Sequence, residues 1–274
     1  MIAWTEYTPG NHRINCPVCT RKPSDKTLGI TLGHDGHGVA HCFRCNYVES
    51  HRPKHGTAYR PAAAIVSPVQ PSKHETLSGY WLDLWNVCKP LYGVSAQYLK
   101  SRHCASPPED GDLRCHPALK HPSGYVGAAL VALITDVHTN QPISLHRTWV
   151  NADGSKADVN PPRMLLAGHR KQGGVIRLWP DECVGCRVAI CEGIETGLSL
   201  GLAYEPVWAC IDAGNLGQFP VLPGVASLLI AADNDVAGIA AANQCAMRWA
   251  NAEREVFITQ QSQNDINDAV LEAA

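Results

Sequence analysis

The chain has 274 residues, of which 45% are hydrophobic and 18% are charged, and its formal net charge is −2. These values predict a globular protein with one large domain or two smaller ones, and they argue against a protein that coats nucleic acid through bulk positive charge. No run of 18 apolar residues occurs, and the first twenty residues lack the apolar run of a signal peptide. We therefore expect a soluble, cytoplasmic protein that does not contact membranes.

The first segment, residues 1–52, is rich in cysteine, histidine and glycine. It carries two C-x2-C pairs separated by 22 residues, slightly more than the common spacing in a four-thiolate zinc site. Residues 27–32 and 39–43 can pair as a hairpin between them. A disulfide framework is not expected, because such frameworks belong to short secreted chains. The predicted zinc ligands are Cys16, Cys19, Cys42 and Cys45.

Zinc is predicted to be structural rather than catalytic in this segment. About 50 residues bury too little apolar surface to fold alone, so the metal would supply much of the folding free energy. Four thiolates also leave no open coordination position. The segment could contact nucleic acid or protein, and its sequence favours neither. The residues that offer phosphate or stacking contacts are Arg21, Lys22, Lys26, Phe43, Arg44 and Tyr47.

The remainder divides into a linker and a globular core. Residues 53–74 contain proline, alanine and serine without apolar periodicity, which predicts a linker. Residues 75–180 open with a Trp-rich helical pattern at residues 76–91 and are predicted to form a mixed α+β N-terminal subdomain. Residues 181–274 alternate short β-rich runs with helical patterns, which predicts an α/β unit with a mainly parallel sheet. The predicted strands are 187–191, 207–211, 227–232 and 256–260, and the predicted helices are 195–204 and 238–250.

Acidic residues follow the predicted strands of the α/β unit. Glu192 directly follows the first strand, Asp233 and Asp235 follow the third, and two more acids come after the last. Because the carboxyl ends of parallel strands meet at one edge of a sheet, and carboxylates suit Mg²⁺ or Mn²⁺, we predict a metal site there. The five residues, called the acidic cluster below, are Glu192, Asp233, Asp235, Asp265 and Asp268.

A simpler interpretation is that these carboxylates are ordinary helix N-terminal residues, where free backbone amides favour negative charge. It would explain any one of them alone, and it is the better explanation for Glu195. It explains less well why three strand ends within one α/β unit all carry acids. We therefore keep the metal site as the main hypothesis.

Three motifs carry a family resemblance. Residues 192–196 read E-G-I-E-T, residues 232–238 read A-D-N-D-V-A-G, and residues 265–268 read D-I-N-D. Together they resemble a Toprim domain. Residues 113–168 are similar to the segment that precedes the Toprim unit in primase-like proteins of phages and mobile elements. With the two cysteine pairs in front, most of the chain resembles Toprim-type DNA primases that carry an N-terminal zinc ribbon.

The resemblance implies template-directed synthesis of short RNA primers on single-stranded DNA from nucleoside triphosphates, which is a nucleotidyltransferase reaction. Glu192, Asp233 and Asp235 match the acidic motifs of the family and would hold Mg²⁺ or Mn²⁺ for catalysis, while Asp265 and Asp268 match more loosely. The basic residues that the resemblance implies for holding template and triphosphate are Arg147, Lys156 and Arg163.

Other readings remain open. A Toprim-type nuclease or topoisomerase would use the same acids, but these enzymes need further domains, so we expect neither here. A non-catalytic, zinc-dependent DNA-binding accessory protein is the second alternative. No G-x-x-x-x-G-K-[ST] phosphate loop occurs, so we expect a replicative helicase to be supplied by a separate protein, as suits a phage or plasmid primase. A third C-x2-C pair, Cys183 and Cys186, is predicted to be buried or incidental.

Overall fold

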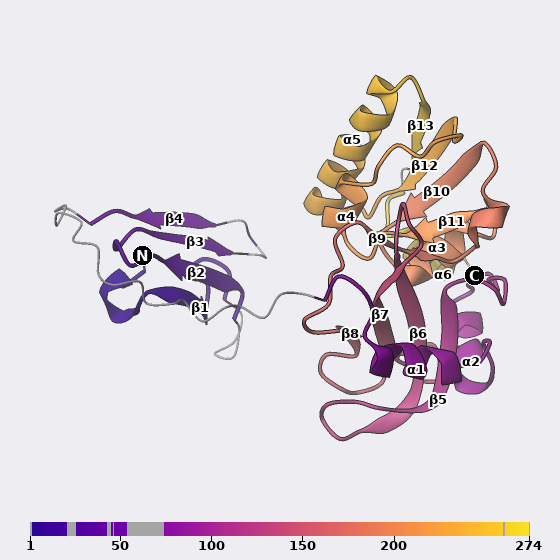
Figure 1. The fold of residues 1–274 in the computed structure, drawn as a ribbon, viewed down its shortest axis with the longest axis horizontal. Coiled ribbons are helices and arrows are strands. Elements are labelled where there is room, and N and C mark those ends of the chain that lie inside the picture. Colours follow the sequence, from indigo (N-terminus) through magenta and orange to yellow (C-terminus); the bar gives the residue numbers. More distant parts are fainter. Residues whose placement is uncertain are drawn as a thin grey trace. The chain divides into compact units, whose positions relative to one another are not determined.

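The computed structural model describes residues 2–20, 26–42, 45, 47–53, 74–259 and 261–273. It divides the chain into two compact units, residues 1–68 and 69–274, which we call the N-terminal and C-terminal units (Figure 1). No helix in the described ranges combines the length and apolar character needed to span a bilayer. Residues 54–73 of the predicted linker lie outside the described residues, as do Arg21, Lys22, Phe43 and Arg44.

The N-terminal unit is a small antiparallel sheet with the strand order β1-β2-β3-β4. The predicted hairpin is confirmed, because Leu28 pairs with Cys42 and Leu32 pairs with Gly38. Alternate residues of β2 point to one face of the sheet, where Leu28 and Ile30 are fully buried. The elements of this unit are η1 (Trp4–Glu6), β1 (Gly10–Ile14), β2 (Leu28–Leu32), β3 (Gly38–Cys42) and β4 (Val48–His51).

The C-terminal unit is built on one nine-stranded mixed sheet with the order β13-β12-β10-β11-β9-β6-β7-β8, in which β5 also pairs with β6. Its strands are β5 (Leu113–Lys120), β6 (Val126–Asp136), β7 (Pro142–Trp149), β8 (Arg163–Leu165), β9 (Gly174–Arg177), β10 (Arg187–Cys191), β11 (Val207–Ala209), β12 (Ser227–Ala231) and β13 (Glu255–Ile258). Its helices are α1 (Gly79–Val87), α2 (Gly93–Ser101), η2 (Asp181–Cys183), α3 (Ile194–Leu200), α4 (Ala213–Gly217), α5 (Val236–Asn251) and α6 (Ile266–Ala273).

The last four strands form the predicted α/β unit. Strands β13, β12, β10 and β11 run parallel to one another. Val188 and Ile190 of β10 pack in the cluster that contains α5, whereas Ala189 and Cys191 pack in the cluster that contains α3. Helices therefore cover both faces of this part of the sheet (Figure 1). The predicted fold class, a small β zinc module followed by a mixed core with a mainly parallel α/β unit, is confirmed.

Strand β9 joins this parallel part to the antiparallel strands β5–β8, because it pairs with β6 on one side and with β11 on the other. Arg177, at the end of β9, holds the junction. Its Nε donates to Asp181 Oδ1 at 2.6 Å, its Nη2 donates to the carbonyl of Val137 at 3.2 Å, and its guanidinium lies 4.6 Å from the ring centroid of Trp208. The strands of residues 113–177 and those of the α/β unit thus share one continuous sheet.

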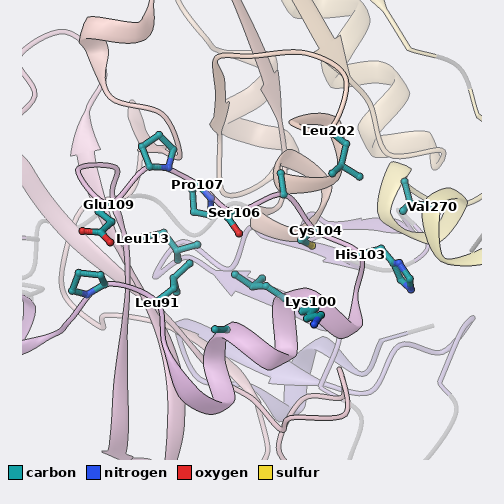
Figure 2. Close-up of a pocket in the computed structure, with 15 residues that line it drawn as sticks. Leu91, Lys100, His103, Cys104, Ser106, Pro107, Glu109, Leu113, Leu202 and Val270 are labelled. Atoms are coloured by element: carbon teal, nitrogen blue, oxygen red, sulfur yellow. The ribbon is translucent and has the colours of Figure 1, made fainter.

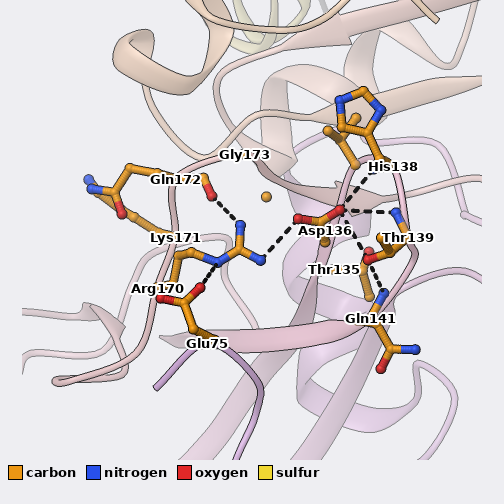
Figure 3. Close-up of polar contacts among 12 residues, drawn as sticks. Glu75, Thr135, Asp136, His138, Thr139, Gln141, Arg170, Lys171, Gln172 and Gly173 are labelled. Carbon is orange, nitrogen blue, oxygen red and sulfur yellow. Dashed lines mark hydrogen bonds and ion pairs between the residues drawn. The ribbon is translucent and has the colours of Figure 1, made fainter. Parts of the chain in front are cut away.

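A second arginine, Arg170, holds Glu75 near the start of the C-terminal unit (Figure 3). Arg170 Nε lies 3.1 Å from Glu75 Oε2, and Arg170 Nη2 donates to Asp136 Oδ2 at 2.9 Å. Although burial alone would raise the pKa of Asp136, hydrogen bonds from the backbone of Thr139 and from Arg170 lower it to about 2. This network links the first residues of the core to the end of β6.

Candidate functional site

The four predicted zinc ligands form a compact group, called the thiolate cluster below. Their sulfur atoms all lie within 4.8 Å of one another. Cys16 Sγ lies 3.7 Å from Cys45 Sγ, and Cys19 Sγ lies 3.5 Å from Cys42 Sγ. Four sulfurs that each lie about 2.3 Å from a zinc ion form a tetrahedron with edges of about 3.8 Å. The donor set and its spacing therefore fit Zn²⁺ and leave no open coordination position.

The chemistry of the thiols agrees with this fit. Desolvation and the neighbouring thiols raise the pKa of Cys19 to about 12, because thiolates at this spacing repel one another unless a cation lies between them. No other group of three potential ligands is this compact in the described part of the chain. The third pair, Cys183 and Cys186, is exposed, so the expectation of burial is wrong for it and it remains an incidental pair.

The acidic cluster starts at the carboxyl ends of two neighbouring parallel strands. Glu192 follows β10 directly and Asp233 lies two residues after β12, and the last residues of these strands, Cys191 and Ala231, are paired. From β10 the chain passes through α3 to β11 on one side, and then through α4 to β12 on the other. The direction of the connections therefore reverses between β10 and β12, where α/β sheets of this kind bind ligands.

Two carboxylate oxygens at this point are unsatisfied. Glu192 Oε1 and Asp233 Oδ1 are buried and have no hydrogen-bond partner among the described residues. Desolvation and the charges of Asp233 and Asp235 raise the pKa of Glu192 to about 7. Desolvation and the charges of Asp265 and Asp235 raise the pKa of Asp233 to about 6. The site therefore holds uncompensated negative charge, which a divalent cation would neutralise.

The arrangement suits Mg²⁺ or Mn²⁺ better than a cation that needs a full set of protein ligands. Within the described residues, no three carboxylates of the acidic cluster bring their oxygens within 4.8 Å of one another. Mg²⁺ keeps several waters and binds proteins through one or two carboxylates plus substrate phosphates. Glu192 and Asp233 fit that role, because their unsatisfied oxygens are available for it.

The other three acids begin helices. Asp235 Oδ1 accepts a hydrogen bond from the backbone N–H of Gly238 at 2.7 Å, at the start of α5. Asp265 Oδ1 accepts one from the backbone N–H of Asp268 at 2.9 Å, at the start of α6. The simpler helix N-terminal interpretation is therefore correct for Asp235 and Asp265. Their charges, and that of Asp268, nevertheless act on Asp233 and raise its pKa.

Gly238 shows how closely α5 approaches the acids. A Cβ atom on this residue would lie 2.5 Å from the carbonyl oxygen of Asp233 and 3.0 Å from Glu192 Oε1. The first contact is with backbone and cannot be relieved by a side-chain rotation. Glycine at the end of the A-D-N-D-V-A-G motif thus allows the first turn of α5 to pack against both Glu192 and Asp233.

Two of the three predicted basic residues reach the α/β unit. Arg163 Nη2 donates to Glu195 Oε1 at 2.8 Å, and Lys156 Nζ lies 3.9 Å from the same oxygen. The charge of Arg163 also acts on Asp233 and lowers its pKa, in opposition to the neighbouring acids. The structure therefore brings Arg163, Lys156 and the acidic cluster into one electrostatic neighbourhood.

Arg147 lies elsewhere. Its side chain is buried, with 6% of the residue exposed, and its guanidinium lies 4.9 Å and 5.6 Å from the ring centroids of Trp81 and Trp149. Its Nη2 donates to the carbonyl of Leu165 at 3.4 Å. This placement favours a packing role for Arg147, because a guanidinium enclosed between two indoles is not available to a phosphate.

Sequence reasoning missed two residues of this neighbourhood. Asp212 caps α4 through the backbone N–H of Asn215 at 2.9 Å, pairs with Lys171, and contributes to the raised pKa of Glu192. It lies three residues after β11, so the rule that found Glu192 would have found it too. Glu195 was set aside as a helix residue, and no sequence pattern links it to partners as distant as Tyr98, 97 positions away.

Two pockets occur in the C-terminal unit. A pocket of about 370 Å³ includes Asp233 and Asn234 in its lining and lies between α5 and the segment after β13. A larger pocket of about 700 Å³ is lined by α2, the segment after it, Leu202 and Val270 (Figure 2). None of the predicted site residues lines the larger pocket, so the space next to the acidic cluster is the smaller one.

Solved structures of primases are similar to this chain at low identity. The primase fragment of the bacteriophage T7 primase-helicase protein shares 15% identity with a TM-score of 0.43, over 96% of this chain and 95% of that chain. A DNA primase domain from Pseudomonas aeruginosa shares 14% identity with a TM-score of 0.46, over 71% and 74%. The zinc-binding and RNA polymerase domains of the Aquifex aeolicus primase share 13% identity with a TM-score of 0.46, over 97% and 76%.

At this distance, the structural likenesses carry no functional conclusion. No curated protein matches the chain in sequence. Residues 75–178 match the family model described as a domain of unknown function (DUF7146). Residues 187–274 match the family model of the Toprim domain. The segment that carries the acidic cluster is therefore a Toprim domain, as its three motifs predicted.

Proposed function

We propose that this protein is a DNA primase, which synthesises short RNA primers on single-stranded DNA by metal-dependent nucleotidyl transfer. One observation carries the proposal. In the Toprim domain, Glu192 and Asp233 each have a buried oxygen without a hydrogen-bond partner among the residues that the structure describes, and Arg163 from the preceding segment lies in the same electrostatic neighbourhood. Carboxylates for a cation beside basic groups for phosphate are what phosphoryl transfer requires.

Each group has a role in this proposal. Bound Mg²⁺ or Mn²⁺ would neutralise triphosphate oxygens and lower the pKa of the attacking 3′ hydroxyl. Glu192 and Asp233 hold the cation, and Asp235, Asp265 and Asp268 increase the negative potential around it. The roles of the basic residues follow from their charge: Lys156 and Arg163 bind the triphosphate and carry the charge that develops on the leaving pyrophosphate.

The remaining parts of the chain complete the proposal. We assign residues 1–52 to a zinc ribbon that contacts the single-stranded template, 53–74 to a linker, 75–180 to the N-terminal subdomain of the primase core, and 181–274 to the Toprim domain. A replicative helicase would supply strand unwinding, because the 274 residues contain no phosphate loop of the P-loop type.

Primer synthesis tests the proposal. The native protein and the Glu192→Gln variant are incubated with a mixed panel of single-stranded DNA templates, labelled nucleoside triphosphates and Mg²⁺ or Mn²⁺. Short products from the native protein alone would support a primase. Cleaved template without synthesis would replace the proposal with a nuclease, and DNA binding with neither reaction would replace it with an accessory protein.

A further inference from the structure

Glu195 connects the Toprim domain to the segment before it. It lies in the first turn of α3, with 6% of the residue exposed. Its Oε1 accepts hydrogen bonds from Tyr98 Oη at 2.6 Å and from Arg163 Nη2 at 2.8 Å, and lies 3.9 Å from Lys156 Nζ. All three partners come from residues 75–178, so one buried carboxylate gathers groups from across the domain boundary.

The position of this carboxylate is fixed from a second side. Asn267 of α6 is fully buried, and its Nδ2 donates to Ser199 Oγ of α3 and to the carbonyl of Arg102, each at 2.8 Å. Helix α3 is thus held against α6 and against the end of α2. Glu195 is therefore held in a fixed position. Tyr98, Arg163 and Lys156 have to reach it there.

The two cations keep most of their donors free. Of the five N–H donors of Arg163, one is used by a residue that the structure describes. The contact between Lys156 and Glu195 is an ion pair that is too long for a hydrogen bond. The side chain of Arg163 is 44% exposed, although Glu195, with which it pairs, is buried. Both cations are therefore held at one point and remain able to bind an anion.

Arg163 and Lys156 also interact electrostatically with the acidic cluster. The charge of Arg163 acts on Asp233, and the charge of Asp265 acts on both Arg163 and Lys156. An arginine without an anchor would be drawn to these carboxylates, because they carry uncompensated negative charge. Such a pairing would neutralise the groups that are proposed to hold the metal and would use up the donors that are proposed to hold phosphate.

We propose that Glu195 is a positioning residue that anchors Arg163 and Lys156 and thereby keeps them from pairing with Asp233 and Asp265. The assignment rests on the proposed function for the roles of these cations and acids. Glu195 itself touches neither metal nor substrate. It supplies a competing negative charge that separates the phosphate-binding cations from the metal-binding carboxylates of the same site.

Mg²⁺ affinity, measured by calorimetric titration of the full chain, tests this role without primer synthesis. Glu195→Gln keeps the shape and a hydrogen-bond acceptor but removes the charge. We expect Mg²⁺ to bind about tenfold more weakly, since one competing cation near a partly exposed carboxylate has an effect of this size. Adding Arg163→Ala to this variant removes the released arginine, and we expect R163A/E195Q to recover affinity to within about threefold of the native value.

Two further variants separate positioning from a purely structural role. Glu195→Asp keeps the charge and is expected to retain more Mg²⁺ affinity than Glu195→Gln. Asp136→Asn is the matched control, because it breaks another carboxylate–arginine hydrogen bond of this unit, shown in Figure 3, and should not weaken Mg²⁺ binding. Thermal unfolding of each variant shows whether the fold is intact.

Three results would overturn the inference: native Mg²⁺ affinity in a folded Glu195→Gln variant, a loss that R163A/E195Q does not recover, or an equal loss in Glu195→Asp. If Glu195→Gln does not fold, the Mg²⁺ affinity of the single variant Arg163→Ala tests the inference instead. We expect Mg²⁺ affinity in this variant to stay within about threefold of native, since the arginine is already held away from the acids, and a larger gain would contradict the anchoring. A native protein that binds Mg²⁺ through Glu192 but makes no primers would remove the proposed function and leave this test in place.

Discussion

The thiolate cluster and the acidic cluster differ in how completely they form a metal site. The first brings four donors within 4.8 Å of one another, whereas within the described residues no three acids of the second lie that close together. A closed set of thiolates suits a metal that stabilises a fold, whereas an open set of oxygens suits a metal that shares its coordination with water and substrate. We therefore interpret the buried oxygens of Glu192 and Asp233, which have no partner among the described residues, as part of the proposed functional site rather than as a defect of packing.

The largest expected effect results from disruption of the thiolate cluster. Cys16→Ser, or removal of zinc with a chelator, should unfold the N-terminal unit, because structural zinc contributes roughly 10 kcal/mol or more to such modules. Limited proteolysis should then degrade the N-terminal unit and leave the C-terminal unit resistant. Serine in place of Cys183, which is exposed and outside the thiolate cluster, is the control and should change neither zinc content nor proteolysis. Equal resistance of the Cys16→Ser protein would contradict a structural role for zinc.

The next largest effect is on primer synthesis and concerns the acidic cluster. Asp233→Asn should reduce primer synthesis by about a hundredfold or more, because it removes a carboxylate that is proposed to hold the catalytic cation. The overall fold should persist, since Asp233 Oδ1 has no hydrogen-bond partner among the described residues. Synthesis and DNA binding measured on the same preparation distinguish the two effects. Unchanged primer yield would remove Asp233 from the site.

The two arginines provide a sharper comparison. Arg163→Ala should raise the KM for nucleoside triphosphate by about tenfold, because a charge-assisted contact with phosphate is lost. Arg147→Ala should instead lower the free energy of unfolding by about 1–3 kcal/mol, because Arg147 packs between Trp81 and Trp149. Steady-state kinetics and urea unfolding on both variants test this division. The opposite pattern, with KM changed by the Arg147 variant, would restore Arg147 to the site.

The smallest effect is on stability. The pKa of Glu192 is about 7 in the fold, above the ordinary value of 4.5, so the folded state binds more protons than the unfolded state between these pH values. Without metal, the free energy of unfolding should therefore fall as pH rises through this window, and the full penalty is present above it. Solvent screens this half-buried group, so the contribution is about 1 kcal/mol.

Glu192→Gln isolates that contribution. The variant should be more stable than the native protein at pH 8 without metal, and its stability should respond less to added Mg²⁺. Urea unfolding at pH 5 and pH 8, with and without Mg²⁺, measures both effects. A variant that is less stable than the native protein at pH 8 without metal would show that the carboxylate is not under electrostatic strain.

Much of the α/β unit could be predicted, because its helices and strands have clear local patterns. The predicted helices at 195–204 and 238–250 occur as α3 and α5, and all four predicted strands are present. The strand at 207–211 ends early, at Ala209, because Ile211 adopts a positive φ of 78° that turns the chain toward Asp212. Such a local conformation has no signature in apolar periodicity.

The candidate site was less predictable, because it depends on contacts between distant residues. Acids at strand ends are visible in the sequence, whereas the choice between Arg147 and Arg163 depends on which face of the sheet each side chain occupies. Arg147 in β7 packs against two indoles, while Arg163 at the start of β8 reaches Glu195. Strand β9 and its junction role were also missed, since four residues give too short a pattern to identify.

Cation binding at the acidic cluster can be observed directly. Mn²⁺ is titrated into the native protein, Glu192→Gln and Asp233→Asn, and the bound fraction is followed by electron paramagnetic resonance. We expect that the native protein binds Mn²⁺, that Mg²⁺ displaces it, and that both variants bind it much more weakly. Equal binding by all three proteins would contradict the claim that the unsatisfied oxygens of Glu192 and Asp233 form a metal site.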